Sequence, residues 1–220
     1  MEIVEGIRER KSVRGFKPDQ VPRKVLEEIL TVAARSPSAM NAQPWETTVI
    51  TGKTLDAIRQ GNVELLTSKV KTHPDIWRKP CEGVYRERQI GLAVQLFQLM
   101  DVARDDKAKR AWWLQRGFRF FDAPAAIIIS TDVSMIEVQA LFDLGIYCQS
   151  ICLAAMAYGL GTCIEDQGVK YPEVIRKYTG IPTSKLIINS IAIGYPDWAF
   201  PANKIVSVRE PVQNNVAWFD

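Results

Sequence analysis

Basic residues and a hydroxyl group gather near the amino terminus in the stretch RERKSVR, residues 8–14. An expected helix gives way here to extended chain, in which alternate residues point to the same side. Arg10, Ser12 and Arg14 therefore present two guanidinium groups and a hydroxyl to one side. This set suits a phosphate, because a guanidinium group can bind two of its oxygens at once. From the spacing alone, a solvated basic helix end favoured by the helix dipole remains the open alternative.

Three more segments carry groups that could bind a ligand. The junction Ser36–Trp45, SPSAMNAQPW, holds more prolines and polar side chains than an ordinary helix-to-strand connection needs, which indicates a loop that holds something. In Tyr158–Gln167, YGLGTCIEDQ, glycines end a helix, and the turn could present backbone N–H groups to a planar heterocycle. A helix C-cap that runs into a strand explains the same glycines. Lys204 and Arg209, in NKIVSVREP, form a second pair of cations that means little alone.

Composition excludes several classes of protein. The 220 residues include 28 basic and 25 acidic side chains, a net charge of +3 that is too balanced for a dedicated nucleic-acid binder. One histidine, His73, and four cysteines without a Cys-x-x-Cys pair make a metal site unexpected. Cys148 and Cys152 are spaced to share a helix face, where we expect buried packing rather than redox chemistry. The lack of a disulfide framework fits a reducing compartment.

Targeting and membrane signals are weak. The amino-terminal MEIVEGIRERK lacks the long apolar region of a signal peptide. The most apolar long stretch, Leu141–Leu160, contains Asp143 and Gln149, which favours a buried central helix over a membrane span. We therefore expect a cytoplasmic protein that binds neither nucleic acid nor membrane.

Hydrophobic periodicity predicts more helices than strands. Helices are expected over residues 2–10, 22–35, 53–69, 86–102, 107–118, 134–159 and 172–178. Strands are expected over residues 45–51, 125–131, 162–164 and 185–195. Because the strands are few and scattered, the predicted fold is α+β, a single domain over residues 1–220 with a small sheet wrapped by helices.

Two finer expectations concern helix faces and caps. In the first helix, Ile3 and Ile7 are expected to face inward. Ser134 is a plausible N-cap of the long central helix, with Glu137 at the position that completes a capping box.

The tail from residue 196 to 220 is expected to be irregular, yet it keeps Trp218 and Phe219 almost at its end. Chain termini usually fray unless something holds them. Either these aromatics pack back onto their own domain, or the tail is an arm laid across a partner subunit, which aromatic side chains anchor well.

Six motifs, in this order along the chain, resemble the flavin-dependent nitroreductase family: ERKSVRGF, SPSAMNAQPW, FFDAPAAIII, YGLGTCIED, IAIGYPD and a late basic residue. The central part is similar to the branch that reduces nitrobenzoates and related aromatics. The resemblance implies a nitroreductase-like α+β fold with a small mixed central sheet and a C-terminal arm, residues 196–220, exchanged in a homodimer. It also implies one FMN at each of two subunit interfaces. Hydride would pass in ping-pong fashion from NADH or NADPH through flavin N5 to a small aromatic acceptor, nitroaromatic or quinone-type, with no catalytic side chain.

The resemblance also assigns residues to the cofactor. The phosphate would be held by Arg10, Ser12 and Arg209. Along the phosphate and ring would lie Lys11 and Arg14. The isoalloxazine would be bordered, partly from the other subunit, by Pro37, Ser38, Met40 and Asn41. The N5 and O4 edge would be met, largely through backbone, by Ile164, Glu165 and Asp166. The pyrimidine edge would face Arg116 and Arg119.

The sequence departs from the family pattern at three places. Ser207 stands where many members have a basic residue, and Lys204 is the possible substitute. Arg116 and Arg119 stand where many members have asparagine and lysine, and Asp166 where several have glycine. The alternatives are the same scaffold acting on an enone, a halogenated phenol or flavin itself, a non-catalytic flavin-binding protein, or a plain anion-binding module.

Overall fold

A four-stranded antiparallel sheet forms the centre of the computed structural model, which describes residues 2–219. Its strands are β1 (Glu46–Thr51), β2 (Ala125–Asp132), β3 (Gly161–Glu165) and β4 (Lys185–Gly194), in the order β1-β2-β4-β3. Each neighbouring pair runs antiparallel. The four named strands are thus antiparallel where a mixed sheet was expected, and an isolated bridge between Ser12 and Thr162 adds a parallel contact outside them at the β3 edge.

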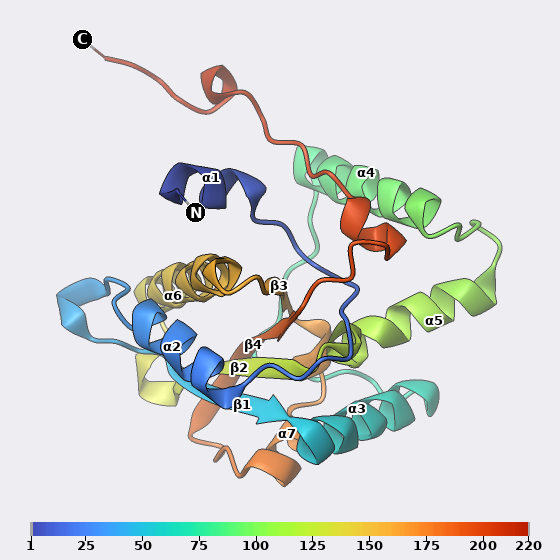
Figure 1. Ribbon diagram of the computed structural model, residues 1–220, viewed down its shortest axis with the longest axis horizontal. Helices are drawn as coiled ribbons and strands as arrows, with labels where there is room; N and C mark the ends of the chain where they lie inside the picture. The colour runs from blue at the N-terminus through green and yellow to red at the C-terminus, as the bar shows by residue number, and fades with distance from the viewer. Residues whose placement is uncertain (1, 220) are drawn as a thin grey trace.

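Helices cover both faces of the sheet (Figure 1). Their bounds are α1 (Ile3–Glu9), α2 (Arg23–Ala33), α3 (Gly52–Thr67), α4 (Gly83–Leu99), α5 (Lys107–Phe118), α6 (Val138–Ala157) and α7 (Pro172–Thr179). Side chains alternate along β2, so Ile127 packs with α2 and α6 while Ile128 packs with α3 and α7. The predicted α+β class, and the prediction that the AAIIIST strand is buried on both faces, are confirmed.

Helix α6 is the central helix of one layer. By length and composition it is apolar enough to cross a membrane. It packs instead against α2 and the sheet, and Leu144, Cys148, Ile151 and Cys152 are buried there. This burial is that of a core helix, as predicted.

Two finer predictions are wrong. Ile3 and Ile7 are 77% and 55% exposed, because α1 buries only Gly6 within the chain. Ser134 does not cap α6. Instead, the backbone N–H and the hydroxyl of Ser134 both donate to the carboxylate of Asp132, at 2.9 and 2.6 Å. Ser134 therefore lies in a short 3-10 turn, and α6 starts four residues later.

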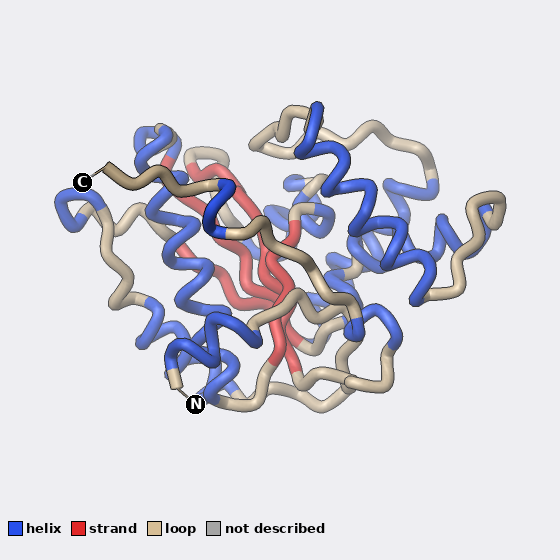
Figure 2. Tube along the Cα trace, turned by 90° about the horizontal axis from the view of Figure 1, so that it is seen from above, coloured by secondary structure: helices blue, strands red, loops and turns tan. Residues whose placement is uncertain are grey.

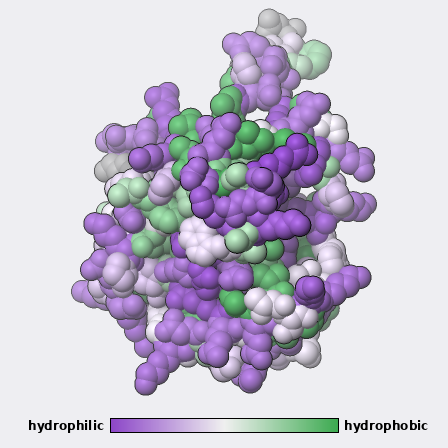
Figure 3. Space-filling view, turned by 90° about the vertical axis from the view of Figure 1, so that its right-hand side faces the viewer, coloured by the Kyte–Doolittle hydropathy of each residue, from purple (hydrophilic) through white to green (hydrophobic). Residues whose placement is uncertain are grey.

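Helix α4 and the end of the tail lie above this body in Figure 1, and Figure 2 shows from above how the tail crosses the molecule. No described residue of α4 is buried, and its apolar side chains contribute to the hydrophobic patches visible on that side (Figure 3). Part of the tail is anchored, since Ala202, Asn203 and Ile205 are buried. Beyond Ile205 the chain is exposed, and Trp218 and Phe219 are 81% and 94% exposed. The two aromatics do not pack back onto their own domain.

Candidate functional site

The two ends of the chain meet in a basic hollow of about 780 Å³. Arg10 and Lys11 reach it from the end of α1, and Arg209 reaches it from the tail. Arg209 is held near its own backbone, since Nη1 donates to the carbonyl and the hydroxyl of Ser207 at 2.9 and 2.8 Å. With Arg8, four cations from opposite ends of the sequence thus line one cavity, together with the carboxylate of Glu9, and this excess of positive charge is suitable for a phosphate.

Lys204 is not among the residues that line this hollow in the described part of the chain. It is exposed at the end of the 3-10 turn Pro201–Lys204. The residue before it, Asn203, has a role that sequence reasoning missed. Its buried side chain accepts from the backbone N–H groups of Arg14 (2.7 Å) and Gly15 (3.2 Å) and donates to the carbonyls of Gly15 (2.8 Å) and Asp197 (2.7 Å). Its backbone carbonyl accepts from Lys11 Nζ at 2.9 Å. Asn203 therefore joins the basic segment to the tail, and no local sequence signal marks it.

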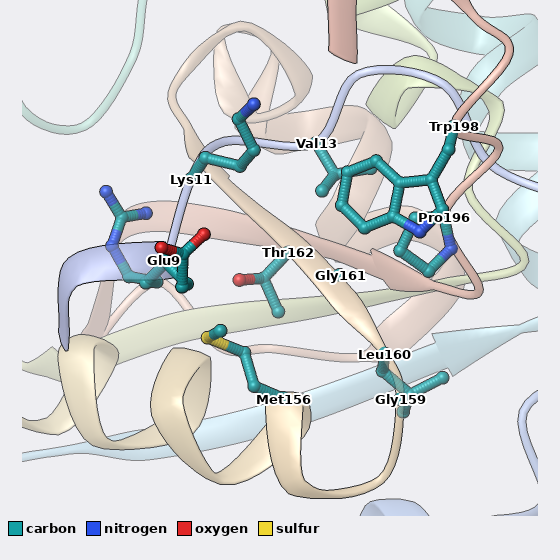
Figure 4. A pocket seen from close by; sticks show the side chains of 11 residues that line it. Glu9, Lys11, Val13, Met156, Gly159, Leu160, Gly161, Thr162, Pro196 and Trp198 are labelled. Atoms are coloured by element: carbon teal, nitrogen blue, oxygen red, sulfur yellow. The ribbon is translucent and has the colours of Figure 1, made fainter. Parts of the chain in front are cut away.

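Gly15 allows this close approach. A Cβ at position 15 would lie 2.2 Å from the ring of Phe200, so any larger residue would push the tail away. The basic segment is also bound to the sheet, because Val13 N donates to the Thr162 carbonyl at 2.9 Å at the start of β3. A smaller hollow of about 220 Å³ lies beside this junction, where Lys11, Val13 and Trp198 surround Thr162 (Figure 4).

The segment Ile164–Asp166 continues β3 from the same junction. The carboxylate of Glu165 turns into the protein, where it accepts from Gly168 N at 2.8 Å and from the Ser190 hydroxyl. Desolvation by burial raises the pKa of Glu165 to about 7. With this side chain turned inward, the backbone of the segment and the 38%-exposed side chain of Ile164 remain to face a ligand.

The SPSAMNAQPW loop is rigidly shaped but lies elsewhere. Met40, Asn41 and Gln43 have positive φ angles, and the Ser38 hydroxyl accepts from Gln43 N at 2.9 Å. Pro37 and Asn41 are exposed, and Met40 is 100% exposed.

The loop is attached to α6 at two points. Ser36 Oγ donates to Ser150 Oγ at 2.7 Å, and Ala39 N donates to Asp143 Oδ2 at 3.1 Å. Gln149, which lines the basic hollow, is six residues after Asp143 on the same helix, about 9 Å at the rise of an α-helix. Pro37, Ser38, Met40 and Asn41 are nevertheless not among the residues that line the hollow.

Arg116 and Arg119 have partners within the chain. The buried guanidinium of Arg116 donates to Asp122 Oδ2 (2.7 Å) and to the carbonyls of Arg14 (2.9 Å) and Phe121 (3.1 Å). Its burial lowers its pKa. Arg119 binds the same carboxylate, Nε to Oδ1 at 2.7 Å, and this hydrogen bond raises the pKa of Arg119. Arg116 therefore contacts the basic segment directly at Arg14, whereas Arg119 is connected to it through the shared carboxylate of Asp122.

The remaining chemical candidates are structural. Cys148, Cys152 and Cys163 are buried, and burial raises the pKa of the Cys148 thiol to about 12 and that of Cys163 to about 11, so these thiols are protonated at neutral pH. His73 lies at the surface, 2.7 Å from Glu173. Within residues 2–219, no group of three His, Cys, Asp or Glu side chains could hold a metal ion.

Comparison with known proteins identifies the class of this fold and site. The sequence model of the nitroreductase family matches residues 7–195, and the chain belongs to that family. A 4-nitrobenzoate reductase of Nocardioides sp. (strain LMS-CY) is 32% identical over 96% of this chain and 87% of its own length. A chloronitrobenzene nitroreductase of Comamonas testosteroni is 29% identical over 92% and 90%. The crystal structure of the FMN and NADPH-dependent nitroreductase NfnB of Sphigopyxis sp. strain HMH superposes with a TM-score of 0.95 at 27% identity, over the full length of both chains.

Proposed function

We propose that this protein is an FMN-dependent NAD(P)H oxidoreductase that reduces nitroaromatic or quinone-type acceptors. The observation that carries the proposal is the basic hollow, in which Arg10, Lys11 and Arg209 converge beside the start of β3 in a chain of the nitroreductase family. Relatives with this sequence pattern include two 4-nitrobenzoate reductases, 32% and 29% identical. A nitroaromatic acceptor is therefore the first to test, ahead of an enone, a halogenated phenol or free flavin.

The residues present fit FMN. Arg10, Lys11 and Arg209 supply three cations for a terminal phosphate, and Ser12, whose hydroxyl the family resemblance assigns to the same phosphate, follows Lys11 in the chain. The Ile164–Asp166 segment begins on the edge strand β3, and the side chain of Ile164 is 38% exposed, so this segment is accessible to a ligand. Arg14 and the Arg116–Arg119 pair add positive charge on the far side of the basic segment. When bound, FMN supplies the hydride chemistry, and the protein supplies binding, orientation and charge.

We further propose a homodimer in which the tail 196–220 crosses to the partner subunit. Three exposed features support it: the aromatic end of the tail, the apolar residues of α1 and α4, and the tip of the SPSAMNAQPW loop. Exposed apolar side chains that lie together mark surfaces for association. The loop residues Pro37, Ser38, Met40 and Asn41, which do not line the basic hollow of their own chain, would then complete the site of the other subunit. We place the protein in the cytoplasm, since its buried cysteines are free thiols and fit a reducing compartment. We treat residues 1–220 as a single domain.

The test is an anaerobic acceptor panel on the purified protein. A yellow protein that oxidises NADH or NADPH under nitrogen beyond the one equivalent that reduces its own FMN, and only when a nitroaromatic or a quinone is added, supports the proposal. A yellow protein without NAD(P)H oxidation is a non-catalytic flavin binder, and a colourless protein that binds phosphate is an anion-binding module. Sizing chromatography of FMN-replete protein tests the dimer, because an active monomer with full FMN content would refute it.

A further inference from the structure

A single carboxylate holds two of the arginines that the family resemblance places at the flavin. Asp122 Oδ1 accepts from Arg119 Nε at 2.7 Å, and Oδ2 accepts from Arg116 Nη1 at 2.7 Å and Arg119 Nη2 at 3.1 Å. Arg116 and Arg119 precede Asp122 by six and three residues in the sequence. The side chains of Arg116 and Arg119 are only 10% and 25% exposed, and that of Asp122 is 39% exposed, so the two guanidinium groups are largely shielded from water.

The turn that carries Asp122 is held in an unusual shape. Phe120, Phe121 and Asp122 have φ angles of 54°, 52° and 60°, a region that residues other than glycine rarely adopt. Such backbone persists where surrounding contacts fix it. Arg59 provides these contacts, since its guanidinium donates to the carbonyls on either side of the turn, those of Arg119 (3.0 Å) and Ala123. The position of the Asp122 carboxylate is thereby determined by the fold.

This turn is connected to the basic segment. Arg116 donates to the Arg14 carbonyl at 2.9 Å, and the Arg14 guanidinium lies 5.9 Å from the centre of the Phe121 ring. Arg116 also lies 4.6 Å from the ring of Phe200, next to the place where Asn203 joins the tail. The Asp122 cluster, defined as Asp122 with Arg116 and Arg119, therefore contacts the basic segment at Arg14, three residues after Lys11, which lines the basic hollow.

We propose that Asp122 is a positioning residue, which fixes the two guanidinium groups beside the flavin and limits the positive charge there. The inference rests on the proposed function, because it concerns bound FMN. Two-electron reduction adds negative charge to the N1 and O2 edge of the flavin, so nearby cations favour the reduced form. Asp122 opposes part of that effect: the cluster has two positive charges and one negative charge. Neutralising Asp122 therefore raises the reduction potential, whereas loss of either arginine lowers it.

The experiment is an anaerobic redox titration of FMN-saturated protein, with dissociation constants for oxidised and reduced FMN. Asp122→Asn keeps the shape of the side chain and removes its charge. It should tighten binding of reduced FMN relative to oxidised FMN by about tenfold, which corresponds to a rise in potential of about 30 mV. Asp122→Glu keeps the charge and should change this ratio by less than about twofold. If Asp122→Asn does not fold, Asp122→Ser makes the same change in charge and is judged by the same criterion.

Asp56→Asn is the matched control. Asp56 binds Arg59 Nη1 at 2.9 Å on the outer side of the same network, and its side chain is 69% exposed. The same change in charge there should leave the ratio within about twofold of the wild type. An FMN-binding protein whose ratio is unchanged, or falls, in Asp122→Asn overturns this inference alone. A protein that binds no FMN at all overturns the proposed function and the inference with it.

Discussion

The clearest pH-dependent prediction concerns Glu165. Its carboxylate is buried between Gly168 and Ser190, and its pKa is raised from 4.5 to about 7. Between these two values the folded protein binds a proton that the unfolded chain has lost. Stability therefore falls as the pH rises from about 4.5 to about 7, and it is flat on either side of this window. The difference of about 2.5 between the two pKa values, at about 1.4 kcal/mol for each unit, corresponds to about 3.5 kcal/mol over the whole window.

Glu165→Gln removes the titrating group and keeps its size. The variant should lose this fall in stability, so between pH 5 and pH 8 it should gain about 2.5 kcal/mol relative to the wild type, because part of the wild-type change lies below pH 5. The assay is urea unfolding of both proteins at pH 5, 6, 7 and 8, with the same excess of FMN. Glu64→Gln, which neutralises an exposed carboxylate, is the control and should follow the wild type. Parallel wild-type and Glu165→Gln curves across the window would refute the reasoning.

The remaining predictions concern the cofactor and the fold. Arg10→Ala and Arg209→Ala should each weaken FMN binding about tenfold to a hundredfold, by the size of a charged hydrogen bond, and riboflavin binding much less; equal losses for both flavins would place these arginines elsewhere. Arg119→Ala should lower the FMN potential by about 30 mV or more in a redox titration, and no change would remove Arg119 from the site. Asn203→Ala should cost about 2–4 kcal/mol in urea unfolding, because it leaves buried backbone groups unpaired; a loss below about 1 kcal/mol would contradict the bonds described. Replacing all four cysteines by serine or alanine, with folding retained, should leave turnover within a few-fold, and loss of flavin reduction would make a thiol catalytic.

The sequence alone determined the elements with strong local patterns. The apolar AAIIIST run specified β2, since a strand covered on both faces has no polar side. The periodicity of residues 107–118 specified α5. The order of the family motifs located the basic segment and the segment around Glu165, because each is a short stretch whose residue types carry its chemistry.

Only the tertiary structure decided which residues meet. Arg10 and Arg209 lie at opposite ends of the chain, and the hollow that they share depends on the packing of the tail against residues 11–15. Asn203 has no sequence signal, because its partners are 188 and 189 residues away. Ser134 fits the capping pattern, but Asp132 takes both of its donors. A sequence pattern records which groups are available locally, whereas their pairing depends on long-range packing and on which partner is nearest after the chain has folded.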